Sequence, residues 1–77
     1  MTQAYILLTT EGGAEDAVLS QVRNIAGVEH AYVSYGVYDI IIKVKAETMQ
    51  ELKDVVTYRI RKIESVQSTL TLLLVDE

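Results

Sequence analysis

Cysteine and proline are absent from this 77-residue chain, and so are phenylalanine and tryptophan. Without cysteine the chain has no disulfide bond, thiolate metal site or thiol nucleophile, and the lack of disulfides favours a reducing compartment. Without proline or a low-complexity tract, nothing in the sequence indicates a linker between domains. We therefore predict a single domain that extends from residue 1 to residue 77.

Positive charge is also scarce. Seven Lys and Arg residues stand against eleven Asp and Glu residues, a net charge of −4, and an acidic domain is poorly suited to hold a phosphate backbone. Direct binding to nucleic acid is therefore disfavoured. No apolar run is long enough to cross a bilayer, and the first residues, MTQAYILLTT, lack the basic leading region of a signal peptide. The sequence predicts a soluble, cytoplasmic protein without a membrane partner.

Groups suited to catalysis are few. The single histidine, His30, falls in a predicted strand, where a surface or interface position is the usual one. Gly12-Gly13 is not followed by the Gly-Lys-Ser/Thr of a P-loop, and we interpret it as the loop before a helix. Glu11, Glu15 and Asp16 crowd that helix start, where the helix dipole favours acids, so a structural role is preferred to metal binding. No catalytic residue, metal site or cofactor is predicted, and the chain is not expected to be an enzyme.

The burial pattern of the first half of the chain recurs in the second half. Apolar positions align with apolar positions, as Val22 does with Ile60, although few aligned residues are identical. Each half carries apolar residues at intervals of three and four, which is typical of one face of an amphipathic helix. Each half is therefore predicted to contain one helix, and the first has the apolar positions Ala14, Ala17, Val18, Val22 and Ile25.

Local signals mark the ends of both predicted helices. Gly27 suits the left-handed position that follows a helix. The second helix begins with TMQE, in which Thr48 can cap and Glu51 can return the hydrogen bond. Three basic residues in its last turns favour the negative end of the helix dipole: Arg59, Arg61 and Lys62.

Four runs rich in Ile, Val, Leu, Tyr and Thr flank these helices and are typical of strands: AYILLT, EHAYVSY, YDIIIKVK and QSTLTLLLV. The order strand-helix-strand occurs twice, and the handedness of crossover connections favours the split arrangement. We predict an α+β, ferredoxin-like βαββαβ fold, with a four-stranded antiparallel sheet and both helices on one face. Consecutive residues are apolar in DIIIK and TLLLV, so we expect the open face to pack against the sheet of another subunit.

One acid stands where an apolar run begins. In SYGVYDIIIKV, residues 34–44, Asp39 directly precedes Ile40. Strand alternation directs its side chain, with that of Ile41, away from the face of Ile40 and toward the expected interface. A buried carboxylate without a partner would be costly. Either it meets a partner there, or it accepts backbone N–H bonds and fixes the turn, and the residues alone leave both interpretations open.

Two segments, IAGVEHAYVSYGVYDIIIKVKA and SVQSTLTLLLV, resemble the C-terminal domain of the leucine-responsive regulator/AsnC (Lrp/AsnC) family of transcription factors, called the RAM domain. The similarity spans essentially all 77 residues. The elements that carry it are Gly27-Val28 before a strand, a Gly-x-Tyr-Asp turn at residues 36–39, and the Thr-x-Thr pair Thr69 and Thr71.

The resemblance implies two roles: an oligomerisation unit with dimeric α/β-barrel-type sheet pairing, whose dimers assemble further, and a sensor that binds an amino acid between dimers. It implies a ligand site in the loop around the Gly-x-Tyr-Asp turn, where Gly36 allows close backbone approach and Asp39 meets an α-ammonium or organises the loop. The expected ligand-binding residues are Tyr35, Gly36, Val37, Tyr38 and Asp39, with Thr69 and Thr71 as hydroxyl partners.

The family's N-terminal helix-turn-helix is not found, since only Met1 to Gln3 precede the first predicted strand. The expectation is a ligand-binding domain without a DNA-binding domain, which affects transcription indirectly, alone or with full-length family members. A small enzyme of the dimeric α/β-barrel type is the alternative, but catalytic groups are sparse. An ACT-like amino-acid-binding domain shares the strand order but gives no reason for the Gly-x-Tyr-Asp turn.

Overall fold

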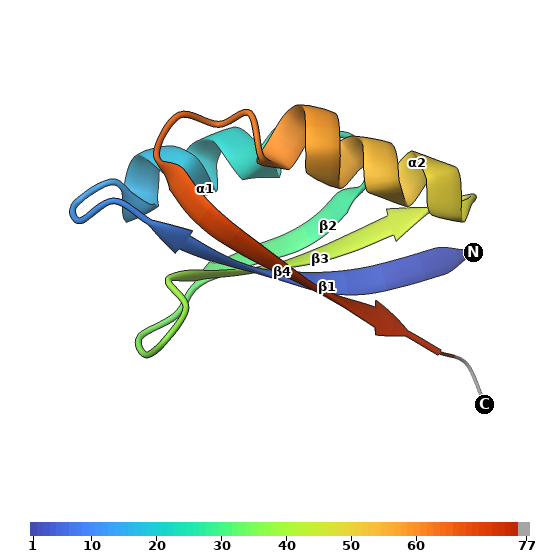
Figure 1. The fold of residues 1–77 in the computed structure, drawn as a ribbon, viewed down its shortest axis with the longest axis horizontal. Helices are drawn as coiled ribbons and strands as arrows, with labels where there is room; N and C mark the ends of the chain where they lie inside the picture. Colours follow the sequence, from blue (N-terminus) through green and yellow to red (C-terminus); the bar gives the residue numbers. More distant parts are fainter. Residues whose placement is uncertain (76–77) are drawn as a thin grey trace.

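The computed structural model describes residues 1–75 and places four strands and two helical segments around one apolar core. In chain order these elements are β1 (Thr2–Thr10), α1 (Glu15–Arg23), β2 (Val28–Val33), β3 (Ile40–Ala46), α2 (Met49–Asp54) continued by η1 (Val55–Ile60), and β4 (Val66–Leu74). The strands form one antiparallel sheet in the order β2-β3-β1-β4. Figure 1 shows α1 and α2 on the same face of this sheet. The predicted ferredoxin-like fold is confirmed.

Alternation along β1 and β3 places every second side chain beneath the helices. Burial of each large apolar side chain there contributes about 1.5–3 kcal/mol to folding. Within residues 1–75, no helix is long and apolar enough to cross a membrane. The largest fully buried side chains are Ile6 and Leu8 of β1, Ile40, Ile42 and Val44 of β3, Val18 and Val22 of α1, Leu52 of α2 and Ile60 of η1.

The sequence signals predict the start of α2 well but place the end of the first helix too late, because α1 ends at Arg23 and Gly27 lies in the turn before β2. Gly27 has a φ of +98°, and a Cβ there would lie 3.2 Å from the backbone oxygen of Lys45, so only glycine fits without strain. At the start of α2 the backbone N–H of Glu51 donates to Thr48 Oγ1 over 3.1 Å. The Glu51 carboxylate accepts from the backbone N–H of Glu47, 3.2 Å away, one residue before the position that the capping-box pattern predicts.

The second helix changes its hydrogen-bonding pattern after Asp54. The segment η1 is a π-helix, and Arg61 N donates to Val56 O at 2.9 Å, a bond across five residues. The sequence predicts that the α-helix continues through these residues and gives no sign of the wider turn. Turns of this kind are rare and are often found where a helix carries function.

The two edges of the sheet differ. On β2, Arg23 Nη2 donates to the backbone oxygen of Ala31 at 3.0 Å, and the register shifts between Val28 and His30. Both features hinder the addition of another strand. On β4 no charged residue occurs between Val66 and Leu74. The register of β4 with β1 also shifts, between Thr9 and Thr10, so the two edges differ mainly in the charged side chain that covers β2.

The buried hydroxyl of Thr10 leads us to predict a substitution that stabilises the fold. This residue is 6% exposed, and its Oγ1 has no hydrogen-bond partner within the described residues. Because valine has the same shape without the unpaired hydroxyl, Thr10→Val should raise the free energy of unfolding by about 1 kcal/mol and the melting temperature by about 4–8 °C. Thermal denaturation at fixed protein concentration measures both.

Thr9→Val is the matched control for this measurement. Thr9 Oγ1 lies 2.6 Å from Ser68 Oγ, within hydrogen-bonding distance, so removal of its hydroxyl should give no such gain. A Thr10→Val variant that melts below the unmutated protein would show that the Thr10 hydroxyl is hydrogen-bonded in solution, and the expectation would be wrong.

Candidate functional site

Apolar side chains reach from one edge of the sheet to the other on the face opposite the helices, which also carries charged side chains such as Lys43. The strand register aligns four apolar side chains in one row across it: Tyr32, Ile41, Leu7 and Leu70. Leu70, Leu72 and Leu74 of β4 are each more than 40% exposed on this face. The prediction that β3 and β4 carry apolar side chains on both faces is confirmed. Contiguous apolar surface of this kind marks an interaction site.

The Gly-x-Tyr-Asp turn lies in the connection between β2 and β3, at one end of the sheet. Figure 1 shows this loop extending away from the helices. Tyr35 is 97% and Val37 is 84% exposed, whereas Tyr38 is half-buried. Gly36 has a φ of +151°, which residues with a side chain rarely adopt. The loop therefore presents a tyrosine, a valine and bare backbone to solvent.

Asp39 fixes this loop to the sheet through three hydrogen bonds of 2.8 Å. Its backbone N–H donates to Leu8 O, and its backbone oxygen accepts from Ser34 N. Its Oδ2 accepts from the backbone N–H of Thr10. The carboxylate therefore extends the contact between β1 and β3 by one residue before the start of β3. This is the backbone role that the sequence left open. No hydrogen bond to Oδ1 is found within residues 1–75.

Thr69 and Thr71 do not meet the Asp39 carboxylate within one protomer. The register pairs Thr69 with Leu8 and Thr71 with Ile6, which places both threonines on the side of the helices. Thr69 is half-buried there, and Thr71 is exposed because β4 is an edge strand. Within residues 1–75, neither threonine side chain forms a hydrogen bond to the loop.

Two other hydroxyls, which the sequence did not indicate, lie together on the uncovered face: those of Thr9 and Ser68. Thr9 pairs with Ser68 across β1 and β4, and their side-chain oxygens are 2.6 Å apart. Thr9 is the residue between Leu8 and Thr10, both of which bond to Asp39. Only the strand register brings Thr9 and Ser68 together near the start of β3. Nothing in the local sequence indicates that these two residues are neighbours.

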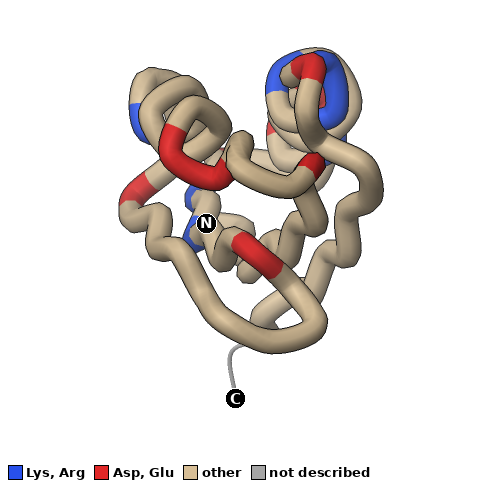
Figure 2. The backbone as a smooth tube through the Cα atoms, turned by 90° about the vertical axis from the view of Figure 1, so that its left-hand side faces the viewer, with Lys and Arg blue, Asp and Glu red and all other residues tan. Residues whose placement is uncertain are grey.

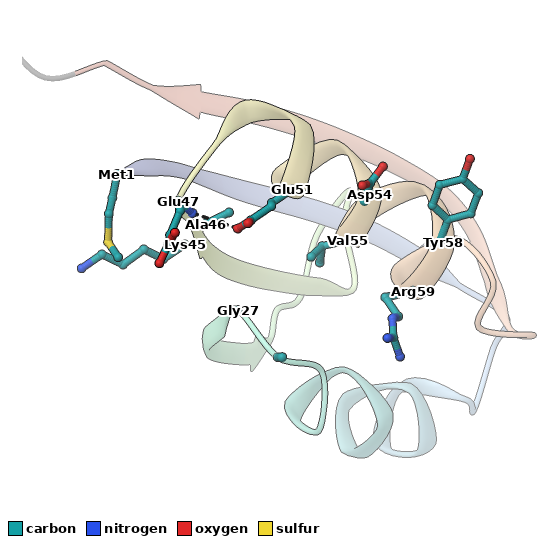
Figure 3. Close-up of a pocket in the computed structure, with 11 residues that line it drawn as sticks. Met1, Gly27, Lys45, Ala46, Glu47, Glu51, Asp54, Val55, Tyr58 and Arg59 are labelled. Carbon is teal, nitrogen blue, oxygen red and sulfur yellow. Dashed lines mark hydrogen bonds between the residues drawn. The ribbon is translucent and has the colours of Figure 1, made fainter.

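A groove between the α1–β2 connection and the helical segment formed by α2 and η1 lies at the other end of β3, where α2 begins. It encloses about 590 Å³ and is lined by Gly27, Ala46 and Val55, with charged side chains around them. Figure 3 shows Glu47 and Glu51 toward one end, and Arg59 directed toward α1. Figure 2 shows charged residues mainly on the helical segments and their connections. Acids and bases both line this groove, so no single class of ligand is favoured.

Metal binding has no support within residues 1–75, where no group of three or more His, Asp or Glu side chains could hold an ion. Glu15 and Asp16 lie in the first turn of α1, where the helix dipole favours acids, as predicted.

Comparison with known proteins identifies one family model and relatives that are all named as regulators of the same type. Residues 3–77 match the family model described as the Lrp/AsnC ligand binding domain. An HTH-type transcriptional regulator of Pyrococcus abyssi is 30% identical over 78 residues, which cover 97% of this chain and 52% of the relative. The chain spans about half the length of the curated relatives it matches.

Two solved structures share the fold. A protein from Thermus thermophilus superposes with a TM-score of 0.95 at 31% identity, covering 100% of this chain and 96% of that one. A transcriptional regulator from Neisseria meningitidis, solved as a complex with L-Met, superposes with a TM-score of 0.88 and covers 99% of this chain and 51% of that one. Its identity is 18%, so this second likeness concerns the fold alone.

Proposed function

Because the chain belongs to the Lrp/AsnC ligand-binding domain family, we propose that it is an effector-binding and oligomerisation module whose ligand is a free amino acid or a similar small molecule. The curated relatives are named as transcriptional regulators, and the family is one of regulators, not enzymes. The chain is therefore a regulatory ligand-binding domain, and its ligand, site and assembly are the parts proposed here.

The observation that carries the ligand site is the position of Asp39 beside an exposed loop. One carboxylate oxygen is held by Thr10 N at 2.8 Å, which fixes the direction of the other oxygen. A carboxylate so held is preorganised to accept a hydrogen bond from an α-ammonium group. The proposed site comprises Tyr35, Gly36, Val37, Tyr38 and Asp39, completed by Thr69 and Thr71 of a neighbouring protomer. The Neisseria regulator, which shares this fold, was solved as a complex with L-Met, so free amino acids are the first ligands to test.

The proposed assembly begins with two copies that pack their uncovered sheet faces together. Pairing would remove from water the row that contains Ile41 and Leu7 and the exposed leucines of β4. The gain is about 25 cal/mol for each Å² of apolar surface buried. These dimers would assemble further, so that loops and threonines of different protomers meet.

We also propose how the module reaches its target genes. Residues 1–77 would act as one ligand-binding domain, and their effect on transcription would be indirect, exerted alone or in mixed assemblies with full-length family members. An acidic domain of net charge −4 has little affinity for DNA by itself. Such assemblies would form in the cytoplasm, where the helix-turn-helix relatives would bind DNA.

A thermal-shift screen of the twenty amino acids tests the ligand class. A ligand that binds only the folded state at a hundred times its dissociation constant adds about 2.7 kcal/mol to the free energy of unfolding. We expect one amino acid, or a group of similar ones, to raise the melting temperature, and the amine that lacks its carboxylate to have a smaller effect. If none of the twenty shifts the melting temperature at millimolar concentration, the proposal of an amino-acid ligand is wrong.

A further inference from the structure

A second hollow, which we call the α1–η1 hollow, lies between the last turn of α1 and η1. It encloses about 610 Å³, a volume in the range of small-molecule sites. The hollow continues from the groove at the start of α2, and the residues that line both are Ala26, Val55, Tyr58 and Arg59. None of the described residues that line it belongs to the loop of Asp39 or to β4, so it is separate from the ligand site proposed above.

The walls of the α1–η1 hollow combine apolar surface with side-chain amides. Ile25 and Ile63 supply the apolar surface, and Gln21 and Asn24 supply the amides. Each amide nitrogen donates to a backbone oxygen of α1, and its second N–H is left for a ligand. Among the described residues that line the hollow, Arg59 is the only charged one.

The guanidinium of Arg59 has no partner of opposite charge within residues 1–75, where the only ion pair is that of Lys43 with Glu29. Figure 3 shows Arg59 directed toward α1. The acid one turn earlier, Asp54, accepts instead from Gln50 Nε2 over 3.0 Å. Because a planar guanidinium can hold a carboxylate through two parallel N–H bonds, Arg59 gives the hollow a place for one anionic group.

The π-turn of η1 explains how the helix faces the core and the hollow at once. Leu52 and Ile60 are both fully buried, although eight residues of regular α-helix would place them about 80° apart around the helix axis. The wider turn brings Ile60 back over the core and leaves Val55, Tyr58 and Arg59 along the hollow. Such turns are frequently found at functional sites.

We propose that the α1–η1 hollow binds a small organic acid with an apolar, ring-bearing body, whose single carboxylate pairs with Arg59. The apolar body lies against Ile25, and its ring packs on Tyr58, since aromatic pairs gain more than their buried area alone provides. In the adjoining groove the acids Glu47 and Glu51 lie toward the start of α2. They disfavour a second anionic group at that end, so the ligand class is a monocarboxylate.

Isothermal titration calorimetry of the full chain with indole-3-acetate tests this site, and indole-3-acetamide is the uncharged probe of the same shape. We expect the acid to bind at least about tenfold more tightly than the amide, because its hydrogen bonds to the guanidinium are charge-assisted. Arg59→Gln should remove that difference. The control Arg61→Gln, at an exposed arginine outside the hollow, should keep it.

A second pair of variants tests the position of the site. Ala26→Leu adds volume inside the hollow and should weaken binding of the acid by about tenfold or more. Ala17→Leu makes the same change on the exposed side of α1 and should leave the affinity unchanged. Thermal denaturation of each variant measures whether it is folded.

Three results would overturn the inference: equal affinity for the acid and the amide, no binding of the acid at millimolar concentration, or unchanged affinity for the acid in Arg59→Gln or in a folded Ala26→Leu protein. Asp39→Asn should bind indole-3-acetate as the unmutated protein does. A loss of affinity in that variant would instead place the acid in the amino-acid site proposed above, and the α1–η1 hollow would not be its site.

Discussion

Ile41→Lys should yield folded monomers, whereas Ile40→Lys should yield no folded protein. The two isoleucines are neighbours on β3, but Ile40 is 0% exposed beneath the helices and Ile41 is half-buried on the uncovered face. A lysine at position 40 loses about 1.5–3 kcal/mol of apolar burial and adds the larger cost of an ammonium buried without a partner. Together these costs approach the free energy of unfolding of a small domain, at least about 5 kcal/mol.

A lysine at position 41 acts on assembly instead. Ile41 lies in the row that includes Leu7 and Tyr32, so the proposed dimer would contain two ammonium groups in an apolar interface. Light scattering measures the mass, and circular dichroism measures the fold. Ser20→Lys adds the same charge on the exposed side of α1 and should leave the mass unchanged. A monodisperse monomer before mutation would contradict the proposed pairing, and so would an Ile41→Lys protein of unchanged mass.

Asp39→Asn should weaken amino-acid binding by about ten- to a hundredfold and leave the stability of the fold nearly unchanged. The amide keeps an oxygen that can accept from the backbone N–H of Thr10, but it lacks the charge that would meet an α-ammonium. A hydrogen bond to a charged group is worth about 1.5–3 kcal/mol, which corresponds to that range of dissociation constants. Isothermal titration calorimetry measures the affinity, and thermal denaturation measures the stability.

Asp39→Ala distinguishes the two roles of this carboxylate. It should lose the same affinity and also lower the free energy of unfolding by about 1–3 kcal/mol, because Thr10 N loses its acceptor. Asp16→Asn, at an exposed position on α1, should leave the affinity unchanged. If Asp39→Asn binds as tightly as the unmutated protein, Asp39 does not belong to the site and only its contact with Thr10 remains.

Gly36→Val should weaken binding by a similar factor. A Cβ at this position meets no atom of the described residues within 4 Å, although the φ of +151° strains any side chain. If the free energy of binding falls by more than the free energy of unfolding, the ligand or a neighbouring protomer approaches this backbone closely. Calorimetry and thermal denaturation of the same sample measure both.

The fold could be predicted because its signals are local. Alternating burial in β3 and the cap at Thr48 both follow from residues a few positions apart. The π-turn at Val55–Ile60 was not predicted, because its sequence, VVTYRI, satisfies an α-helix equally well. The two helices differ by less than one residue in each turn, too little for six residues to distinguish.

The candidate site depends on contacts between distant parts of the chain, which the sequence does not encode locally. Thr10 is 29 residues from Asp39, and their hydrogen bond exists only in the observed register of β1 and β3. The side taken by Thr69 and Thr71 is likewise set by the pairing of β4 with β1. A shift of one residue would turn both threonines to the uncovered face.

The first and last strands of the chain are neighbours, with β1 between β3 and β4 (Figure 1). β4 is the last of the four strands to be synthesised, so until it leaves the ribosome β1 has one edge without its partner strand. Pairings over such sequence separations fold slowly, and the unpaired edge is exposed to aggregation in the meantime. Subunits should therefore meet only after each sheet has been completed by its β4 strand. The composition of any mixed oligomer would then follow the concentrations of completed subunits, irrespective of which messages are translated side by side.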